Sequence, residues 1–221
     1  MLKFSNGNRK MQELAKMLGL NKKQVVCFDL PAGYTCPMAV LCKTYANPAS
    51  GKIVDGKEQV FRCYAASSEA RFKNSRALHW DNYNTLKNSA DMVSEINNAI
   101  PEKVKVIRIH SSGDFFSKEY FNAWVQVARD NPDVSFFGYT KVLEYVKADK
   151  SDNFHLVYSY GGKNDSELTD EPVAYVVNSV NDGLARGLFV ACQAQPSDDY
   201  YAVMRGQSFA LALHGTQPAK R

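Results

Sequence analysis

Short β-branched runs alternate with helical patterns along the second half of the chain, and this alternation restricts the fold more than any other feature of the sequence. Strand, helix and strand in succession form βαβ units, whose strands are parallel. The expected strands are 25–30, 104–109, 134–138, 154–158, 173–177, 188–191 and 209–213, with helices at 117–129, 142–146 and 197–204. The pattern predicts an α/β protein with a parallel sheet of about six strands, either a partial (β/α) barrel, which we favour, or an open doubly wound sheet.

The first hundred residues are mainly helical in pattern. A helix is expected over 9–18, and further helical patterns cover 67–78 and 81–100, the last of which Pro101 closes. The length of 221 residues and the hydrophobic content of 45% fit one core, so residues 1–221 are interpreted as a single α/β domain.

The loop 31–66, which follows the first expected strand, holds Cys36, Cys42 and Cys63. Thiolates are soft ligands for iron–sulfur clusters and zinc, and three of them on one loop can hold a metal centre while leaving one coordination position open. Clustered cysteines in a reducing compartment indicate ligands or catalytic groups rather than disulfides. Cys27, in an apolar run, is interpreted instead as a buried small side chain.

Polar residues follow several expected strands, and the carboxyl ends of parallel strands share one face of the fold. We therefore expect these residues to line one mouth; they are His110, Ser111, Ser112, Gly113, Asp114, Lys141, Ser159 and His214. His110, Lys141 and His214 are the candidate catalytic residues. Simpler roles stay open: His110 as a core histidine, Lys141 as a solvated strand-end charge, and His214 as an anchor of the C-terminus.

Two further charged residues admit competing interpretations. Asp114 can cap the helix that follows, although Ser117 is better placed to do so. Arg108 stands inside a β-branched strand, where burial without a partner is costly. The partner that we expect for Arg108 is a cofactor carboxylate or an internal acid.

Several unusual strings occur in an order that resembles the bacteriophage gene product 88 family. They are LPAGYTCPMAVLC, FRCYAASSEAR, RIHSSGDFFSKEYFNAW, FFGYTK and LHGTQPA, and they extend through nearly the whole chain. The resemblance implies a phage origin more than an activity.

A more distant resemblance is to the radical S-adenosylmethionine enzymes, whose three cysteines follow the first strand of a partial barrel. It implies that Cys36, Cys42 and Cys63 bind a [4Fe–4S] cluster with one iron free for S-adenosylmethionine. It also implies that Ser111–Asp114 receives the amino group of this cofactor and that Ser159 makes a polar contact with it. The Thr-Lys pair that ends at Lys141 is similar to a pair found at a later strand end in some of these enzymes.

The cysteine spacing departs from that family. Five residues separate Cys36 from Cys42 and twenty separate Cys42 from Cys63, whereas the family's spacing is compact. Long loop insertions are thermodynamically tolerable because the entropy of loop closure grows slowly with length. A fourth ligand from Cys192, Cys27 or His110 would instead close the site and make it structural, with zinc as the alternative metal and a non-catalytic binding protein as the alternative function.

Charge and hydropathy give few further restrictions. Lysine and arginine exceed aspartate and glutamate by 27 to 23, which permits an anionic ligand or nucleic acid without indicating either. No run approaches a membrane span and the N-terminus does not resemble a signal peptide, so a cytoplasmic location in the host cell is expected. The substrate is open, with a nucleic-acid-derived molecule or a host component as possible classes, and so is the oligomeric state.

Overall fold

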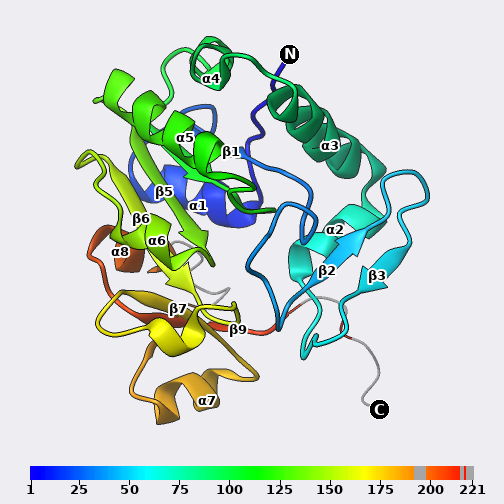
Figure 1. Ribbon diagram of the computed structural model, residues 1–221. Coiled ribbons are helices and arrows are strands. Elements are labelled where there is room, and N and C mark those ends of the chain that lie inside the picture. Colours follow the sequence, from blue (N-terminus) through cyan, green and yellow to red (C-terminus); the bar gives the residue numbers. More distant parts are fainter. Residues whose placement is uncertain (192–197, 215–216, 218–221) are drawn as a thin grey trace.

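The computed structural model, which describes residues 1–191, 198–214 and 217, contains a seven-stranded parallel sheet (Figure 1). The strand order is β1-β4-β5-β6-β7-β9-β8. The strands are β1 Val25–Phe28, β4 Val106–Ile109, β5 Ser135–Thr140, β6 Phe154–Ser159, β7 Val173–Val177, β8 Phe189–Ala191 and β9 Phe209–Ala212. The predicted α/β class and the parallel sheet are confirmed, with seven strands rather than about six.

The order of the strands decides between the two predicted architectures only in part. From β1 to β7 each new strand of the sheet adds beside the previous one, which is the order of a barrel; only β9 and β8 reverse it. Within the described part of the chain β1 and β8 remain the two edges and do not pair with each other, so no closed barrel forms.

Helices cover both faces of the sheet, as Figure 1 shows for α5 in front and α1 behind. Right-handed crossovers place helices on one face while the order advances and on the other face where it reverses. Accordingly α5 Lys118–Asp130, α6 Leu143–Lys147 and α7 Val180–Ala185 follow forward connections, whereas α8 Asp198–Met204 lies between β8 and β9. The helix α1 Arg9–Met17, predicted at 9–18, packs with α8 on the opposite face, which we call the α1–α8 face.

Two hydrophobic clusters show how the sequence divides its apolar residues between these faces. Alternate residues of β1 point to opposite sides, so Val26 and Phe28 join the cluster under α5, while Val25 and Cys27 join the cluster under α1 and α8. Trp124 of α5 is fully buried in the first cluster. Each face of the sheet therefore has its own core.

The helices between the loop and β4 differ from the predicted ranges. They are α2 Tyr64–Arg71, α3 Lys73–Lys87 and α4 Met92–Ala99, not 67–78 and 81–100. Phe72 is extended, with φ −110° and ψ 97°, and separates α2 from α3. Asp91 begins α4 by accepting a hydrogen bond from the Ser94 backbone at 3.0 Å. Local capping and one extended residue thus set boundaries that the hydrophobic periodicity did not reveal.

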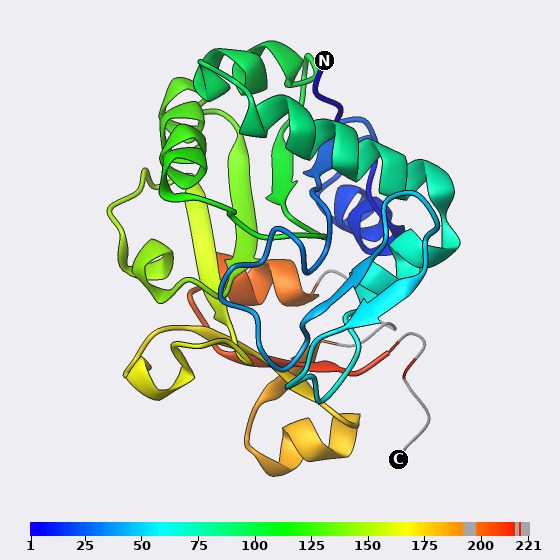
Figure 2. The same ribbon diagram turned by 45° about the vertical axis from the view of Figure 1, so that its right-hand side comes forward.

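The loop 31–66 contains a hairpin that was not predicted, formed by β2 Thr44–Ala46 and β3 Ile53–Asp55 (Figure 2). A short 3-10 helix, Asp165–Glu167, follows β6. Among the described residues, no helix is long and apolar enough to cross a membrane.

Candidate functional site

The three cysteines of the loop 31–66 follow the carboxyl end of β1. The hairpin in this loop explains how the chain returns from Cys42 to Cys63 across twenty residues. Cys63 is the N-cap residue of α2. The backbone N–H groups of Val60 and Phe61 both donate to the carbonyl of Leu41, at 2.9 and 3.1 Å. These bonds bring the chain back beside Leu41, the residue before Cys42. The twenty residues between Cys42 and Cys63 therefore form a loop whose two ends lie close together.

The thiols are close enough to influence one another. Burial raises the pKa of Cys36 well above its usual value, and Asp114, Cys42 and Cys63 raise it further. Burial likewise raises the pKa of Cys63 to about 12, with an added contribution from Cys42. All three side chains are partly buried. Even so, no group of three His, Cys, Asp or Glu side chains is arranged to hold a metal ion in the part of the chain that the structure describes.

Backbone contacts fix the loop against the sheet edge. The carbonyl of Gly161, just after β6, accepts hydrogen bonds from Val40 and Leu41 at 3.1 Å. Gly33 has φ +67°, and a Cβ at this position would collide with the carbonyl of Thr44. The close approach of two backbones therefore requires glycine here. The loop is held from both sides of the cysteine pair Cys36 and Cys42.

The segment after β4 is organised by Asp29, which directly follows β1. Its Oδ1 atom accepts hydrogen bonds from the Ser111 backbone at 2.7 Å, the Ser111 hydroxyl at 2.8 Å and the Ser112 backbone at 3.0 Å. Gly113 has φ +89°, and a Cβ would lie 2.8 Å from the Cβ of Leu30. Ser111, Ser112 and Gly113 thus lie against the start of the cysteine loop, and Asp29 accepts hydrogen bonds from the two serines.

A buried carboxylate, Glu69 of α2, connects the loop to this segment. Its Oε1 atom accepts from the Ala32 backbone at 2.9 Å and the Ser112 hydroxyl at 2.6 Å, and lies 2.8 Å from His79 Nδ1. Burial lowers the pKa of His79, but the hydrogen bond with Glu69 and the charge of Asp29 outweigh it and raise the pKa overall. Asp29, Glu69 and His79 were not among the predicted site residues; the one available signal was Asp29, an acidic residue near the end of the apolar run 25–30.

Asp114 and Lys141 occupy neighbouring positions at the ends of β4 and β5. The Asp114 carboxylate accepts from the Phe115 backbone at 2.8 Å and the Lys141 backbone at 2.9 Å, and burial raises its pKa to about 6. The Lys141 ammonium donates to the carbonyl and hydroxyl of Ser159, at 2.8 and 3.0 Å, and to the carbonyl of Tyr160. Lys141 is buried, so the interpretation as a solvated strand-end charge was wrong.

Asp114 does not cap α5, since the Ser117 hydroxyl accepts from the Tyr120 backbone, as expected for the better-placed residue. The structure thus brings Asp114, Lys141 and Ser159 together, and the charge of Asp114 raises the pKa of Cys36.

The other two candidate catalytic residues have different surroundings. His110 is buried, its Nε2 atom lies 2.9 Å from the Tyr120 hydroxyl, and its ring packs against Phe115. Burial lowers the pKa of His110 to about 3. His214 is exposed, with its ring 4.9 Å from that of Tyr64, the residue after Cys63. The three candidates therefore do not form one catalytic group.

The proposed fourth ligands also have defined positions, apart from Cys192, which lies outside the described residues. Cys27 is fully buried against α1, which agrees with its interpretation as a small core side chain. His110 faces the core under α5. Neither residue is among the main causes of the raised pKa of Cys36 or Cys63.

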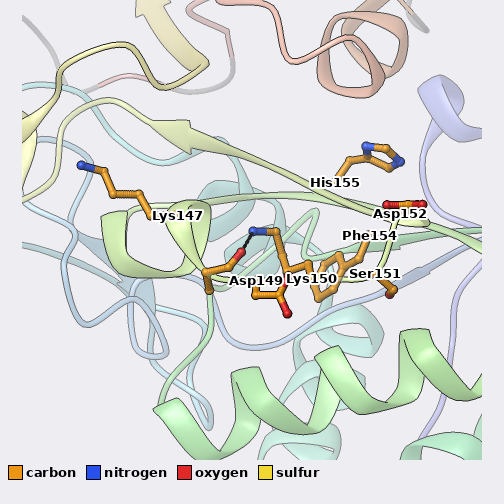
Figure 3. Close-up of a pocket in the computed structure, with 8 residues that line it drawn as sticks. Lys147, Asp149, Lys150, Ser151, Asp152, Phe154 and His155 are labelled. Atoms are coloured by element: carbon orange, nitrogen blue, oxygen red, sulfur yellow. Dashed lines mark hydrogen bonds between the residues drawn. The ribbon is translucent and has the colours of Figure 1, made fainter.

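A surface depression of about 610 Å³ lies away from the cysteines, at the amino end of β6 (Figure 3). Residues 147–152, 154 and 155 line it, and the Lys150 ammonium donates hydrogen bonds to carbonyls of its own loop, including that of Ala148 at 2.6 Å. Ligands of parallel α/β folds bind at the carboxyl ends of the strands. This depression is thus not the candidate site.

Comparisons with known proteins agree with the resemblance found in the sequence. The chain is 35% identical over 111 residues to the Gene 88 protein of Mycobacterium phage L5, covering 44% of this chain and 46% of that protein. It is 33% identical over 111 residues to the Gene 88 protein of Mycobacterium phage D29, with the same coverage. The matches span less than half the length of these relatives, and no solved structure matches. Because the family model of Gene product 88 matches residues 2–220, the chain belongs to the Gene product 88 family.

Proposed function

We propose that Cys36, Cys42 and Cys63 bind a [4Fe–4S] cluster and that the chain is an enzyme of the radical S-adenosylmethionine type. The observation that supports this most is that the three thiols belong to the loop after β1 and that Cys42 and Cys63 both raise the pKa of Cys36. The forward strand order from β1 to β7, which is that of a partial barrel, agrees with the proposal.

The chemistry of the donor set fits a cluster. Iron–sulfur clusters take thiolates as ligands, and burial keeps Cys36 and Cys63 protonated unless a positive centre is present to lower their pKa. Within the described part of the chain, the three sulfur atoms are not arranged to hold a metal ion as they stand. Rotation about χ1 of each cysteine repositions its sulfur without moving the backbone, which the hairpin and Glu69 hold in place.

The positions of the other candidate ligands favour an open site. Cys27 and His110 belong to the two cores of the sheet and not to the loop 31–66, which we call the thiol loop. Three protein ligands leave one iron free, and in radical S-adenosylmethionine enzymes such a cluster supplies the electron for reductive cleavage of the cofactor. A zinc-stabilised, non-catalytic protein would need a fourth ligand, for which Cys192 is the remaining candidate.

The residues around the thiols would hold the cofactor rather than perform the chemistry. Asp114 lies near enough to Cys36 to raise its pKa. Its carboxylate accepts two backbone hydrogen bonds and keeps further lone pairs for an ammonium group. Lys141 fixes Ser159 and is a positioning residue, because its ammonium is fully used by the end of β6. The molecule processed, whether derived from nucleic acid or from a host component, stays open.

The test is purification and reconstitution without oxygen, followed by iron and sulfide analysis and visible spectroscopy. We expect about four irons per chain, a reducible chromophore, and a spectral change when S-adenosylmethionine is added. Alanine at Cys36, Cys42 or Cys63 should each abolish iron binding. Cys27→Ala is the matched control, since Cys27 is a buried cysteine of the same chain outside the loop, and it should keep its iron.

Three results would contradict the proposal: protein without iron after reconstitution, zinc bound in its place, or loss of metal on replacing Cys192 as complete as on replacing Cys36. The last two would support the closed structural site, and chelation should then unfold the protein.

A further inference from the structure

Arg108 is a buried cation on the α1–α8 face of the sheet. It pairs in register with Cys27 on one side and Phe137 on the other, and its side chain is only 4% exposed. The guanidinium carbon lies 5.0 Å from the ring centre of Tyr139 and 6.0 Å from that of Phe137. Aromatic rings attract a cation but accept no strong hydrogen bond, and the Nε–H group of Arg108 has no partner.

Asp199, the acid whose charge acts on Arg108, already accepts hydrogen bonds from two other side chains. Asp199 of α8 accepts at Oδ2 from the Lys10 ammonium at 2.9 Å and from the Tyr139 hydroxyl at 2.7 Å. Among the acids whose side chains the structure describes, none lies within 4.0 Å of the Arg108 guanidinium. Among the side chains that the structure describes, the two cations Arg108 and Lys10 therefore share the carboxylate of Asp199.

Geometry connects the end of β4 with the cysteine loop. The hydroxyl of Tyr64 donates to the carbonyl of Ser111, three residues after Arg108, at 2.6 Å. Tyr64 directly follows Cys63 and packs against His214, which is exposed. The strand that carries Arg108 therefore ends beside Cys63.

We infer that Arg108, assisted by Lys10, binds an oxyanion group, either a carboxylate or a phosphate, of the molecule that is processed at the thiol loop. A guanidinium offers parallel N–H donors that match two oxygens of such a group, and its unpartnered Nε–H is one of them. Lys10 and Arg108 together supply two positive charges beside the carboxylate of Asp199 that they share. The identity of the bound molecule as substrate rests on the proposed function, whereas the anion site itself does not.

The experiment titrates inorganic phosphate and acetate, at ionic strength held constant with chloride, into the wild-type chain and follows the arginine Nε–H signals by NMR. We expect saturable binding of at least one anion and a shift of the signal that is missing in Arg108→Lys. Arg108→Gln should weaken binding by about tenfold or more because a charge-assisted pair is lost. Lys10→Gln should weaken it severalfold, and Arg129→Gln, which removes an exposed arginine, should leave it unchanged.

The inference is overturned if neither anion binds saturably to the wild-type chain. It is also overturned if affinity is unchanged in a folded Arg108→Gln variant or, where that variant does not fold, in Lys10→Gln. The triple serine variant at Cys36, Cys42 and Cys63 separates the two proposals, because it should lose metal and still bind the anion. Anion binding by a wild-type chain that never takes up iron would reject the cluster and keep the anion site.

Discussion

His79 Nδ1 lies 2.8 Å from Glu69 Oε1, and this buried pair joins α3 to α2 directly behind the cysteine loop. The same oxygen accepts from Ala32 at the start of the loop and from Ser112 after β4. One carboxylate therefore sets the relative positions of Cys63, which begins α2, and of the segments on either side of β1 and β4.

Replacing Glu69 with alanine should destabilise the protein and loosen the thiol loop together. Three donors would lose their acceptor inside the core, which costs about 3–5 kcal/mol for a buried charged partner. Urea unfolding measures the free energy, and the rate of thiol labelling of the metal-free protein measures access to the cysteines. Glu102→Ala, at an exposed position after α4, is the control and should change neither.

If labelling of the cysteines stays at the wild-type rate in a folded Glu69→Ala variant, Glu69 does not organise the loop. Glu69→Gln keeps an acceptor oxygen and should show a smaller effect on both measurements.

The pair also makes stability depend on pH. The pKa of His79 is raised in the folded state, so its contribution is fully present below the unfolded pKa of about 6.5. The contribution is lost as the pH rises through the folded value. We expect His79→Gln to lose more stability relative to wild type at pH 6 than at pH 9, as measured by urea unfolding. A difference that is the same at both pH values would show that His79 is neutral in the fold.

The effect of His110 on the pH dependence of stability should be opposite to that of His79. Burial lowers its folded pKa to about 3, so below about pH 6.5 the unfolded chain takes up a proton that the folded chain does not. The free energy of unfolding should therefore fall as the pH decreases from 6.5 toward 3. The size is on the order of 5 kcal/mol for the full shift, at about 1.4 kcal/mol per pH unit.

The check for His110 is the slope of unfolding free energy against pH in wild type and in His110→Asn. Asparagine tolerates the positive φ of +66° at this position better than most residues and does not titrate. Equal slopes in the two proteins between pH 6.5 and 4 would mean that His110 is hydrated or charged in the fold.

The strand ends could be predicted from the sequence, because β-branched runs followed by polar residues mark both the strands and their carboxyl edge. The cysteine loop, Lys141 and Ser159 were found in this way, and the structure places them at that edge. The reversed order of β9 and β8 could not be predicted, since local periodicity carries no information on which strands pair.

The Glu69–His79 pair was missed for a related reason. Its two residues lie on helices separated by the extended Phe72, and helical periodicity across 67–100 suggested different boundaries. An isolated glutamate and an isolated histidine carry no spacing signal, so their contact depends on how α2 and α3 turn toward β1. The sequence indicated that burial of Arg108 is costly. Its relation to Asp199 and Lys10 could not be predicted, because the three residues belong to β4, α8 and α1, which are far apart in the chain.

Gly113 offers a last test of how closely the β4 segment must approach the cysteine loop. A Cβ there would lie 2.7 Å from Thr35 Oγ1 and 2.9 Å from the carbonyl of Leu30, and φ is +89°. Gly113→Ala should therefore cost about 1–3 kcal/mol for backbone strain, with the collision added. Gly19→Ala is a matched control, because Gly19 also has a positive φ of +66° but nothing within 4 Å of the added carbon.

The difference between the two glycine variants in urea unfolding isolates the collision from the strain. A larger loss for Gly113→Ala, together with weaker iron retention in the reconstituted protein, would connect the tight contact between Gly113 and Leu30 to the thiol site. Equal losses would mean that Thr35 and Leu30 yield easily and that the approach of the two segments is not what fixes Cys36.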